Sequence, residues 1–216
     1  MTSVCACLSV SVSPGMALHS AVMSRLPILI VLLLVAACAS PDSQEVPAST
    51  ATSDPAAASS TAPTPFTAAE IRDWNPTGTR LVFRIEDVGR PPVLQTILFV
   101  DGDQNRAVME ASIKTEDGVL IEEADRTERT WVELRDHAAF PVERTKRDAV
   151  TVDVPIGRLA CWLYTVTSTE NGVVTTRTFY FAKRRPGPPV RAETLVDGEL
   201  VSRMDMIEDS RIAASR

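Results

Sequence analysis

The stretch that decides the fold runs from Leu159 to Ala182 and reads LACWLYTVTSTENGVVTTRTFYFA. Its centre, Asn171-Gly172, accepts positive φ and favours a two-residue β-hairpin turn. The flanking runs are rich in Thr, Val and aromatic residues, which fit a pleated and partly buried strand. The stretch therefore predicts a hairpin of two long antiparallel strands.

The register of this hairpin brings four aromatic residues to one face. If Glu170 faces Val173 across the turn, Trp162 lies opposite Phe181 and Tyr164 lies opposite Phe179, because side chains alternate with a period of two. These four are our candidates for core or ligand-facing residues. The other face is less apolar but hardly polar, with Cys161, Leu163, Tyr180, Ala182, Thr165 and Thr178. A sheet that is partly apolar on both faces is covered on both, or curls into a barrel or half-barrel around a helix or ligand.

Similar turn signatures punctuate the chain on the N-terminal and C-terminal sides of this hairpin. Asp101-Gly102, Asp117-Gly118 and Asp197-Gly198 are typical of tight hairpin turns. Strand-like runs lie between the turns: Arg80–Ile85, Val93–Val100, Ala107–Lys114, Val119–Glu122, Val150–Val154, Leu159–Thr167, Val173–Ala182, Val190–Leu195 and Leu200–Met206. We predict a mainly β fold, a single curved antiparallel sheet that is half-barrel or barrel-like.

Two capping boxes predict short helices. Thr67 and Glu70 have the spacing of a Ser/Thr cap with a returning Glu, so a helix is expected from about Ala68 to Trp74, ended by Asn75-Pro76. Thr130 and Glu133 repeat the pattern, and that helix is expected to reach about His137. Its Trp131 and Leu134 are further candidate core or ligand-facing residues. We expect this helix to plug the open side of the curved sheet.

The N-terminal region carries a targeting signal. Residues 26–37, LPILIVLLLVAA, are twelve residues without a polar side chain. A membrane-spanning helix needs about 20 residues, whereas a secretory signal uses roughly 7–15 after a positive charge, here Arg25. The run Val35-Ala36-Ala37-Cys38 resembles the lipobox of bacterial lipoproteins. The resemblance implies cleavage after Ala37, acylation of Cys38 and attachment to the membrane through the acyl chains; an uncleaved hydrophobic anchor is the alternative.

Composition divides the chain into four segments. Residues 1–22 contain no Lys or Arg, so translation is expected to begin at Met23 and residues 1–22 to be a mis-annotated extension. Residues 23–37 form the signal peptide. Residues 38–65 are the lipidated cysteine and a disordered tether, in which 22 of the 27 residues after Cys38 are Ala, Ser, Thr or Pro. Residues 66–216 are the β-rich globular domain.

The net charge and the residue after the lipobox cysteine indicate the class of partner and the location. The formal net charge of -6 provides no basic face for nucleic acid. Ala39, next to the lipobox cysteine, favours by the same resemblance an outer-membrane lipoprotein that faces the periplasm, if the source is Gram-negative. The expected setting is the cell envelope.

No motif in the sequence indicates catalysis, a metal site or a cofactor. His137 has no nucleophile to serve, and Cys161 lies mid-strand, where a buried apolar thiol is expected. Asp101-x-Asp103-x-Asn105 begins like a calcium loop, but Arg106 stands where glycine is required, so a solvated hairpin tip is expected. The basic run 183–185 is expected to be a solvated turn, with contact to anionic head groups as the alternative. We expect the protein not to be an enzyme; the opposite would need carboxylates such as Glu110 and Glu122 to converge.

A second resemblance concerns the domain. The segment 154–164, VPIGRLACWLY, is similar to a VPxGxxxCxxY segment of uncharacterised bacterial envelope lipoproteins. Such domains resemble the open half-barrels of lipoprotein carriers. That likeness implies a lipid-anchored binding protein that holds a lipophilic ligand or acyl chain in its curved sheet. The alternative is a structural or accessory envelope protein that binds other proteins and takes no small-molecule ligand.

Overall fold

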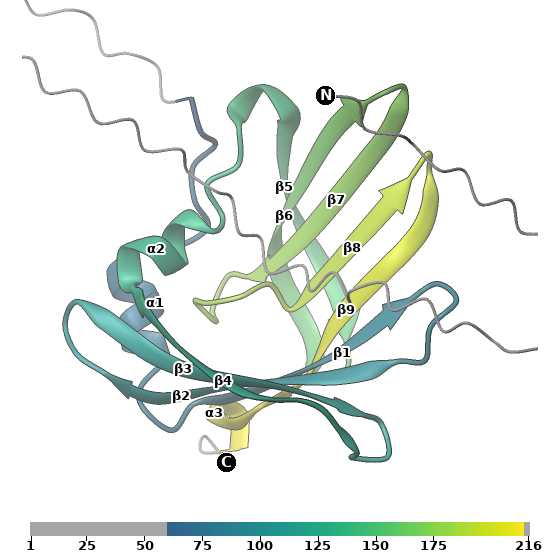
Figure 1. Cartoon of the computed structure of the whole chain (residues 1–216). Helices are drawn as coiled ribbons and strands as arrows, with labels where there is room; N and C mark the ends of the chain where they lie inside the picture. Colours follow the sequence, from purple (N-terminus) through teal and green to yellow (C-terminus); the bar gives the residue numbers. More distant parts are fainter. Residues whose placement is uncertain (1–59, 214–216) are drawn as a thin grey trace, which may run out of the picture. The chain divides into compact units, whose positions relative to one another are not determined.

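The computed structural model describes residues 60–213 of the chain, and these contain one nine-stranded antiparallel sheet. The strands follow the order β4-β3-β2-β1-β9-β8-β7-β6-β5. Their bounds are β1 (Arg80–Asp87), β2 (Val93–Gly102), β3 (Arg106–Thr115), β4 (Leu120–Thr130), β5 (Thr145–Val154), β6 (Gly157–Glu170), β7 (Val173–Ala182), β8 (Arg191–Val196) and β9 (Glu199–Asp209). The sheet is strongly curved, with β2–β4 across the foot of the view and β6–β8 rising from it (Figure 1). The predicted fold class, a mainly β curved antiparallel sheet, is confirmed.

The predicted central hairpin has the expected register. Trp162 pairs with Phe181, and Tyr164 pairs with Phe179. At the turn, Asn171 and Gly172 have φ of 52° and 81°, the left-handed values that these two residue types tolerate best. The hairpin is longer than its apolar core because Thr-rich segments continue the pairing to Glu170 and Val173.

Sequence analysis underestimated two strands: β5 begins at Thr145 rather than at Val150, and β4 is longer at its C-terminal end. The prediction ended at Glu122, whereas β4 continues to Thr130 along β3. Its second half is a run of charged residues that hydrophobic alternation cannot reveal. Charged side chains are common on edge strands, where they discourage pairing with another chain.

Both predicted helices are present and begin at their capping boxes. Helix α1 (Ala68–Trp74) is capped by Thr67, whose hydroxyl accepts from the Glu70 amide while the Glu70 carboxylate accepts from the Thr67 amide. Helix α2 (Trp131–Asp136) repeats this arrangement with Thr130 and Glu133. The two helices contact each other (Figure 1). A 3₁₀ turn, η1 (Val142–Arg144), and a last short helix, α3 (Ser210–Ala213), complete the domain. No helix within residues 60–213 is long and apolar enough to cross a membrane.

Connectivity gives the sheet two different ends. Antiparallel pairing places the turns 88–92, 116–119, 171–172 and 197–198 at one end, which we call the hairpin end. At the other end β1 follows α1, β4 runs into α2, and β9 runs into α3; we call it the helix end. From α2 the chain returns along the sheet to begin β5 at the hairpin end.

The main core lies on the face of the sheet that we call the inner face, marked by Leu81, Phe83, Tyr164, Phe181 and Met206. All five side chains are almost completely buried. On the outer face, by contrast, ion pairs cross neighbouring strands: Arg191 pairs with Asp205 and Arg203 pairs with Glu193, each at 2.6 Å. Alternation thus separates an apolar inner face from a charged outer face over β8 and β9.

A buried polar network closes the helix end. Arg211 donates to both carboxylate oxygens of Asp209, at 2.6 and 2.7 Å, and to Asn75 Oδ1 at 2.8 Å. Asn75 in turn donates to the carbonyls of Ile71 and Pro186. The network ties α1, the loop after β7 and the C-terminal segment together. Asp209 and Asn75 are buried, so their hydrogen bonds meet the requirement that buried polar groups be paired.

Candidate functional site

Five aromatic rings form a continuous cluster on the inner face. The rings of Phe179 and Phe181 are 6.4 Å apart, and Tyr164 meets Phe181 edge-on at 5.5 Å. Phe66 contacts Phe181 at 6.3 Å, and Phe140 stacks on Phe179 at 4.9 Å. Three of the rings are sequence-predicted candidates. Phe140 was missed because Phe140-Pro141 indicated only the end of a helix.

The cluster is covered by two short irregular segments rather than by a second sheet. Residues 60–66 and 138–142, which we call the cover, meet through an isolated bridge between Thr61 and Pro141. The Ala62 amide donates to the Phe140 carbonyl at 2.8 Å, and the Tyr164 hydroxyl donates to the Pro63 carbonyl at 2.6 Å. Ala62 is itself buried. Residues 61–65, which the sequence analysis placed in the tether, lie against the domain: the Ala62 side chain belongs to the inner core, and the Pro63 carbonyl is held by the Tyr164 hydroxyl.

A groove opens beside the cover. It has a volume of about 410 Å³ and is lined by residues 61–64 and Thr67 on one side and by Arg135, Asp136 and Ala139 on the other. The groove therefore follows the seam between the cover segment 60–66 and the α2 region.

The fourth aromatic candidate of the hairpin, Trp162, has a different environment. It is partly exposed, and both Arg147 and Lys183 lie over its ring, at 4.0 and 3.8 Å from the centroid. Arg147 also lies 5.5 Å from the centre of the Tyr164 ring. Among residues 60–211 neither cation has a carboxylate within ion-pair distance. The edge of the aromatic cluster is therefore cationic, which sequence analysis missed because one cation lies on β5 and the other in the turn after β7.

The two α2 candidates do not join this aromatic cluster. Trp131 stacks on Phe99 at 6.4 Å, and its ring nitrogen donates to the Asp103 carbonyl at 2.8 Å. Leu134 is half-buried and packs against the same core. Thus α2 closes the helix end over β2 and β3, and contributes to the inner cover mainly through the segment that follows it.

The titratable groups of the site favour neutral forms. Burial raises the pKa of Cys161 from its usual value to about 11, which the nearby Lys183 only partly opposes. The thiolate is the reactive form, so this cysteine is an inert thiol at neutral pH. Burial likewise raises the pKa of Tyr164, whose hydroxyl is a hydrogen-bond donor to the cover.

The remaining candidate residues lie in a hairpin tip, at the end of a helix and in a strand ladder. Asp103 accepts hydrogen bonds from the Asn105 and Arg106 amides, as expected of a hairpin tip, and these bonds lower its pKa. His137 is the exposed C-cap of α2. Glu110 lies opposite Arg126 in the β3–β4 ladder, whereas Glu122 lies opposite Ile113, so the two carboxylates do not converge.

The basic turn after β7 is less solvated than predicted. Lys183 lies over Trp162, and Arg185 lies 3.6 Å from the buried carboxylate of Asp209. Of the three basic residues, only Arg184 is exposed. The turn packs against the helix end because Asn75 of the buried polar network donates a hydrogen bond to the Pro186 carbonyl.

The targeting predictions fall outside the described residues. These are the extension 1–22, the signal peptide 23–37, the lipobox Val35-Ala36-Ala37-Cys38 and the tether up to residue 59. They stay predictions from the sequence.

No protein-family model matches the chain, and no curated protein matches it. Two solved structures match part of the chain, each at low similarity. One is a protein with a YmcC-like fold from Bacteroides fragilis, with a TM-score of 0.42 and 8% identity, covering 62% of this chain and 96% of that one. The other is MucB in complex with MucA(peri), with a TM-score of 0.42 and 13% identity, covering 65% of this chain and 53% of that one.

Proposed function

We propose that the protein is a lipid-anchored binding module of the cell envelope that takes an acyl chain or similar lipophilic ligand on its inner aromatic face. The observation that carries this proposal is the covering of Tyr164, Phe179 and Phe181 by short irregular segments with a 410 Å³ groove along their seam. The ligand would enter as the cover moves away.

The energetics of exchange favour an apolar ligand. Ala62, Phe66 and Phe140 would leave the aromatic cluster, and an acyl chain would bury comparable area at roughly 0.8 kcal/mol per methylene. The hydrogen bonds of the cover are few, and each contributes about 1 kcal/mol net. A ligand could therefore replace the cover on the aromatic cluster without any change in the pairing of the strands.

The anchor belongs to the same proposal. Acylation of Cys38 would hold the domain at a membrane, from which a lipophilic ligand could be taken without crossing bulk water. Two or three acyl chains give stable attachment where one is marginal. We propose binding rather than catalysis, since Glu110 and Glu122 do not converge and burial keeps the Cys161 thiol protonated at neutral pH.

A cover that can be locked tests the proposal. Thr61 and Pro141 are bridge partners, so a T61C/P141C variant of the full chain is expected to form a disulfide that fastens the cover. Uptake of a fluorescent fatty-acid probe should be lost on oxidation and return on reduction, while unaltered protein binds the probe under both conditions. The proposal is wrong if unaltered protein does not bind the probe; equal uptake by the oxidised and reduced variant would contradict opening of the cover.

The anchor has its own test. Cells supplied with labelled palmitate should yield labelled protein, and the Cys38→Ser variant should lack the label and leave the membrane fraction. An unlabelled but membrane-bound wild-type chain would favour an uncleaved hydrophobic anchor instead.

A further inference from the structure

Exposed aliphatic side chains gather at the hairpin end. Ten large hydrophobic residues are exposed within residues 60–211, and seven of them lie at the turns of this end: Val88, Val119, Leu120, Ile121, Val173, Val174 and Leu200. Single exposed hydrophobic residues need no explanation, but a concentration at one end of a sheet marks an interaction site. The inner core does not use these side chains.

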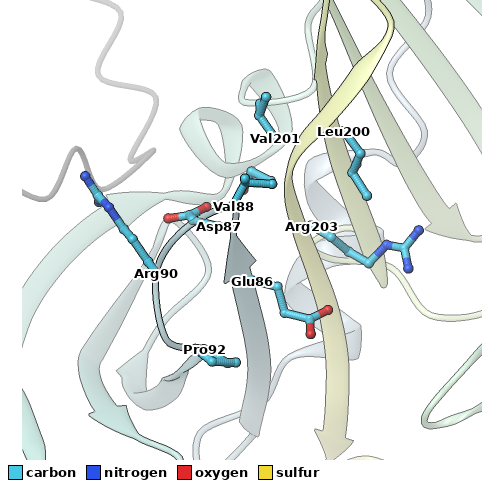
Figure 2. Close-up of a pocket in the computed structure, with 9 residues that line it drawn as sticks. Glu86, Asp87, Val88, Arg90, Pro92, Leu200, Val201 and Arg203 are labelled. Carbon is cyan, nitrogen blue, oxygen red and sulfur yellow. The ribbon is translucent and has the colours of Figure 1, made fainter.

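A shallow groove forms part of this surface (Figure 2). Its volume is about 240 Å³, and it lies between the β1–β2 loop and the start of β9. The loop is fixed to β9 by a hydrogen bond from the Val88 amide to the Val201 carbonyl at 3.0 Å. Val88 and Leu200 are among its lining residues, with exposures of 73% and 41%, so the groove presents exposed aliphatic side chains beside charged ones such as Asp87.

The excess of carboxylates over cations in the domain is concentrated at the same end. Residues 86–92, 114–123, 168–175 and 196–203 hold nine carboxylates against three Lys or Arg residues. Residues 60–213 as a whole hold 25 carboxylates and 20 Lys or Arg residues, so the rest of the domain is close to neutral. At the groove, Glu86 pairs with Arg84 and Arg203 pairs with Glu193, whereas Asp87 has no ion pair among the described residues.

We propose that the hairpin end is a docking surface for a partner protein whose contacting segment combines aliphatic side chains with Lys or Arg. Aliphatic contacts would fill the groove over Val88 and Leu200, and the cations would meet the excess of carboxylates. A second copy of this chain would place like charges against each other. An anionic bilayer would be repelled by the same carboxylates.

Crosslinking in cells tests the location. A photoreactive amino acid is placed at Val88, Val174 or Leu200 of the full chain, and at Val132 on α2 as a control with exposure similar to Leu200. The three hairpin-end positions should give the same protein adduct, and Val132 should not. Equal crosslinking at Val132, or adducts of lipid or of a second copy only, would overturn the proposal.

A binding measurement tests the chemistry. The full chain in neutral detergent micelles is titrated with a synthetic peptide of alternating Lys and Leu, and with its Glu/Leu counterpart. The Lys/Leu peptide should bind more tightly, and the variant D87K/E199K should weaken its binding roughly tenfold at low salt. Val88→Asp should also weaken it, whereas Val132→Asp should not. No preference for the Lys/Leu peptide, or unchanged affinity in both hairpin-end variants, would overturn the proposal.

These experiments are independent of the inner face. Locking the cover by oxidation of the T61C/P141C variant should leave crosslinking and peptide binding at the hairpin end unchanged. Unfolding of the variants is not expected because Val88 is mostly exposed, and a circular dichroism spectrum matching that of the wild type would verify this.

Discussion

The two ends of the sheet differ in how far their apolar side chains are buried. At the helix end, α1 and α2 and the Asp209–Arg211 network cover the strand ends, and Ile71 and Trp131 are buried. At the hairpin end, tight turns leave Val88 and Leu200 in water. The apolar side chains at the turns are therefore exposed because no helix within residues 60–213 covers the hairpin end, whereas α1 and α2 cover the helix end. Stability should therefore depend on the helix end and the inner face, and association should depend on the hairpin end.

The largest effect is expected from the inner face. Phe181→Ala removes a buried ring that contacts Phe66, Tyr164 and Phe179, and should lower the free energy of unfolding by roughly 3–5 kcal/mol. Urea titration followed by circular dichroism measures it. A loss below about 1 kcal/mol would mean that the inner face is not the principal core.

The polar network of the helix end should come next. Asp209→Asn leaves Arg211 and Arg185 without their carboxylate. We expect the free energy of unfolding to fall by about 3 kcal/mol, since removing one partner of a buried ion pair is costly. The midpoint of urea unfolding reports the change. For comparison, Asp205→Asn affects a pair at the more open outer face and should cost less; the reverse order would contradict the role assigned to the network.

A smaller effect is expected at the cap of α1. Thr67→Ala should cost about 1 kcal/mol at neutral pH, while Thr67→Ser should retain most of the stability. Hydrogen bonds from Thr67 lower the pKa of Glu70 below its ordinary value. The part of the capping contribution that depends on the Glu70 carboxylate is therefore present above the ordinary pKa of Glu and is lost as pH falls through the lowered pKa. Unfolding curves at several pH values should show the difference between variant and wild type becoming smaller in acid, as the hydroxyl bond to the Glu70 carboxylate is lost; a constant difference would contradict this coupling.

The smallest effect is expected at the hairpin end. Val173→Ala and Leu200→Ala should change the free energy of unfolding by less than about 0.5 kcal/mol each, because both side chains are substantially exposed. The same urea titrations measure this. A loss near 2 kcal/mol for either variant would remove the contrast between the two ends.

Sequence reasoning recovered the elements more completely than their assembly. All nine strands, both capped helices and the register of the β6–β7 hairpin could be predicted, because turn dipeptides, alternation and capping boxes are local signals. Sequence alternation also grouped Trp162 with Tyr164, Phe179 and Phe181 on one face.

The cover and the cationic edge could not be predicted, since they depend on contacts between distant segments. Ala62 meets Phe140 across 78 positions of chain, and neither residue has a local pattern that indicates the other. Arg147 lies over Trp162 because β5 pairs with β6 in a particular register. The charged half of β4 was missed for a related reason: its pairing with β3, and not its own hydrophobicity, makes it a strand.

The pairing of β1 with β9 has a kinetic consequence. Local hairpins can form on either side of it while the chain is incomplete, but the continuous sheet requires Phe83 to meet Met206 near the opposite end of the sequence. Contacts between such distant positions carry a high loop-closure cost and are characteristic of slow folding. Until the last strand arrives, the inner edge of each half-sheet is unpaired, which is the condition in which strands associate wrongly with other chains. Folding of this domain is therefore expected to be limited by the meeting of its first and last strands.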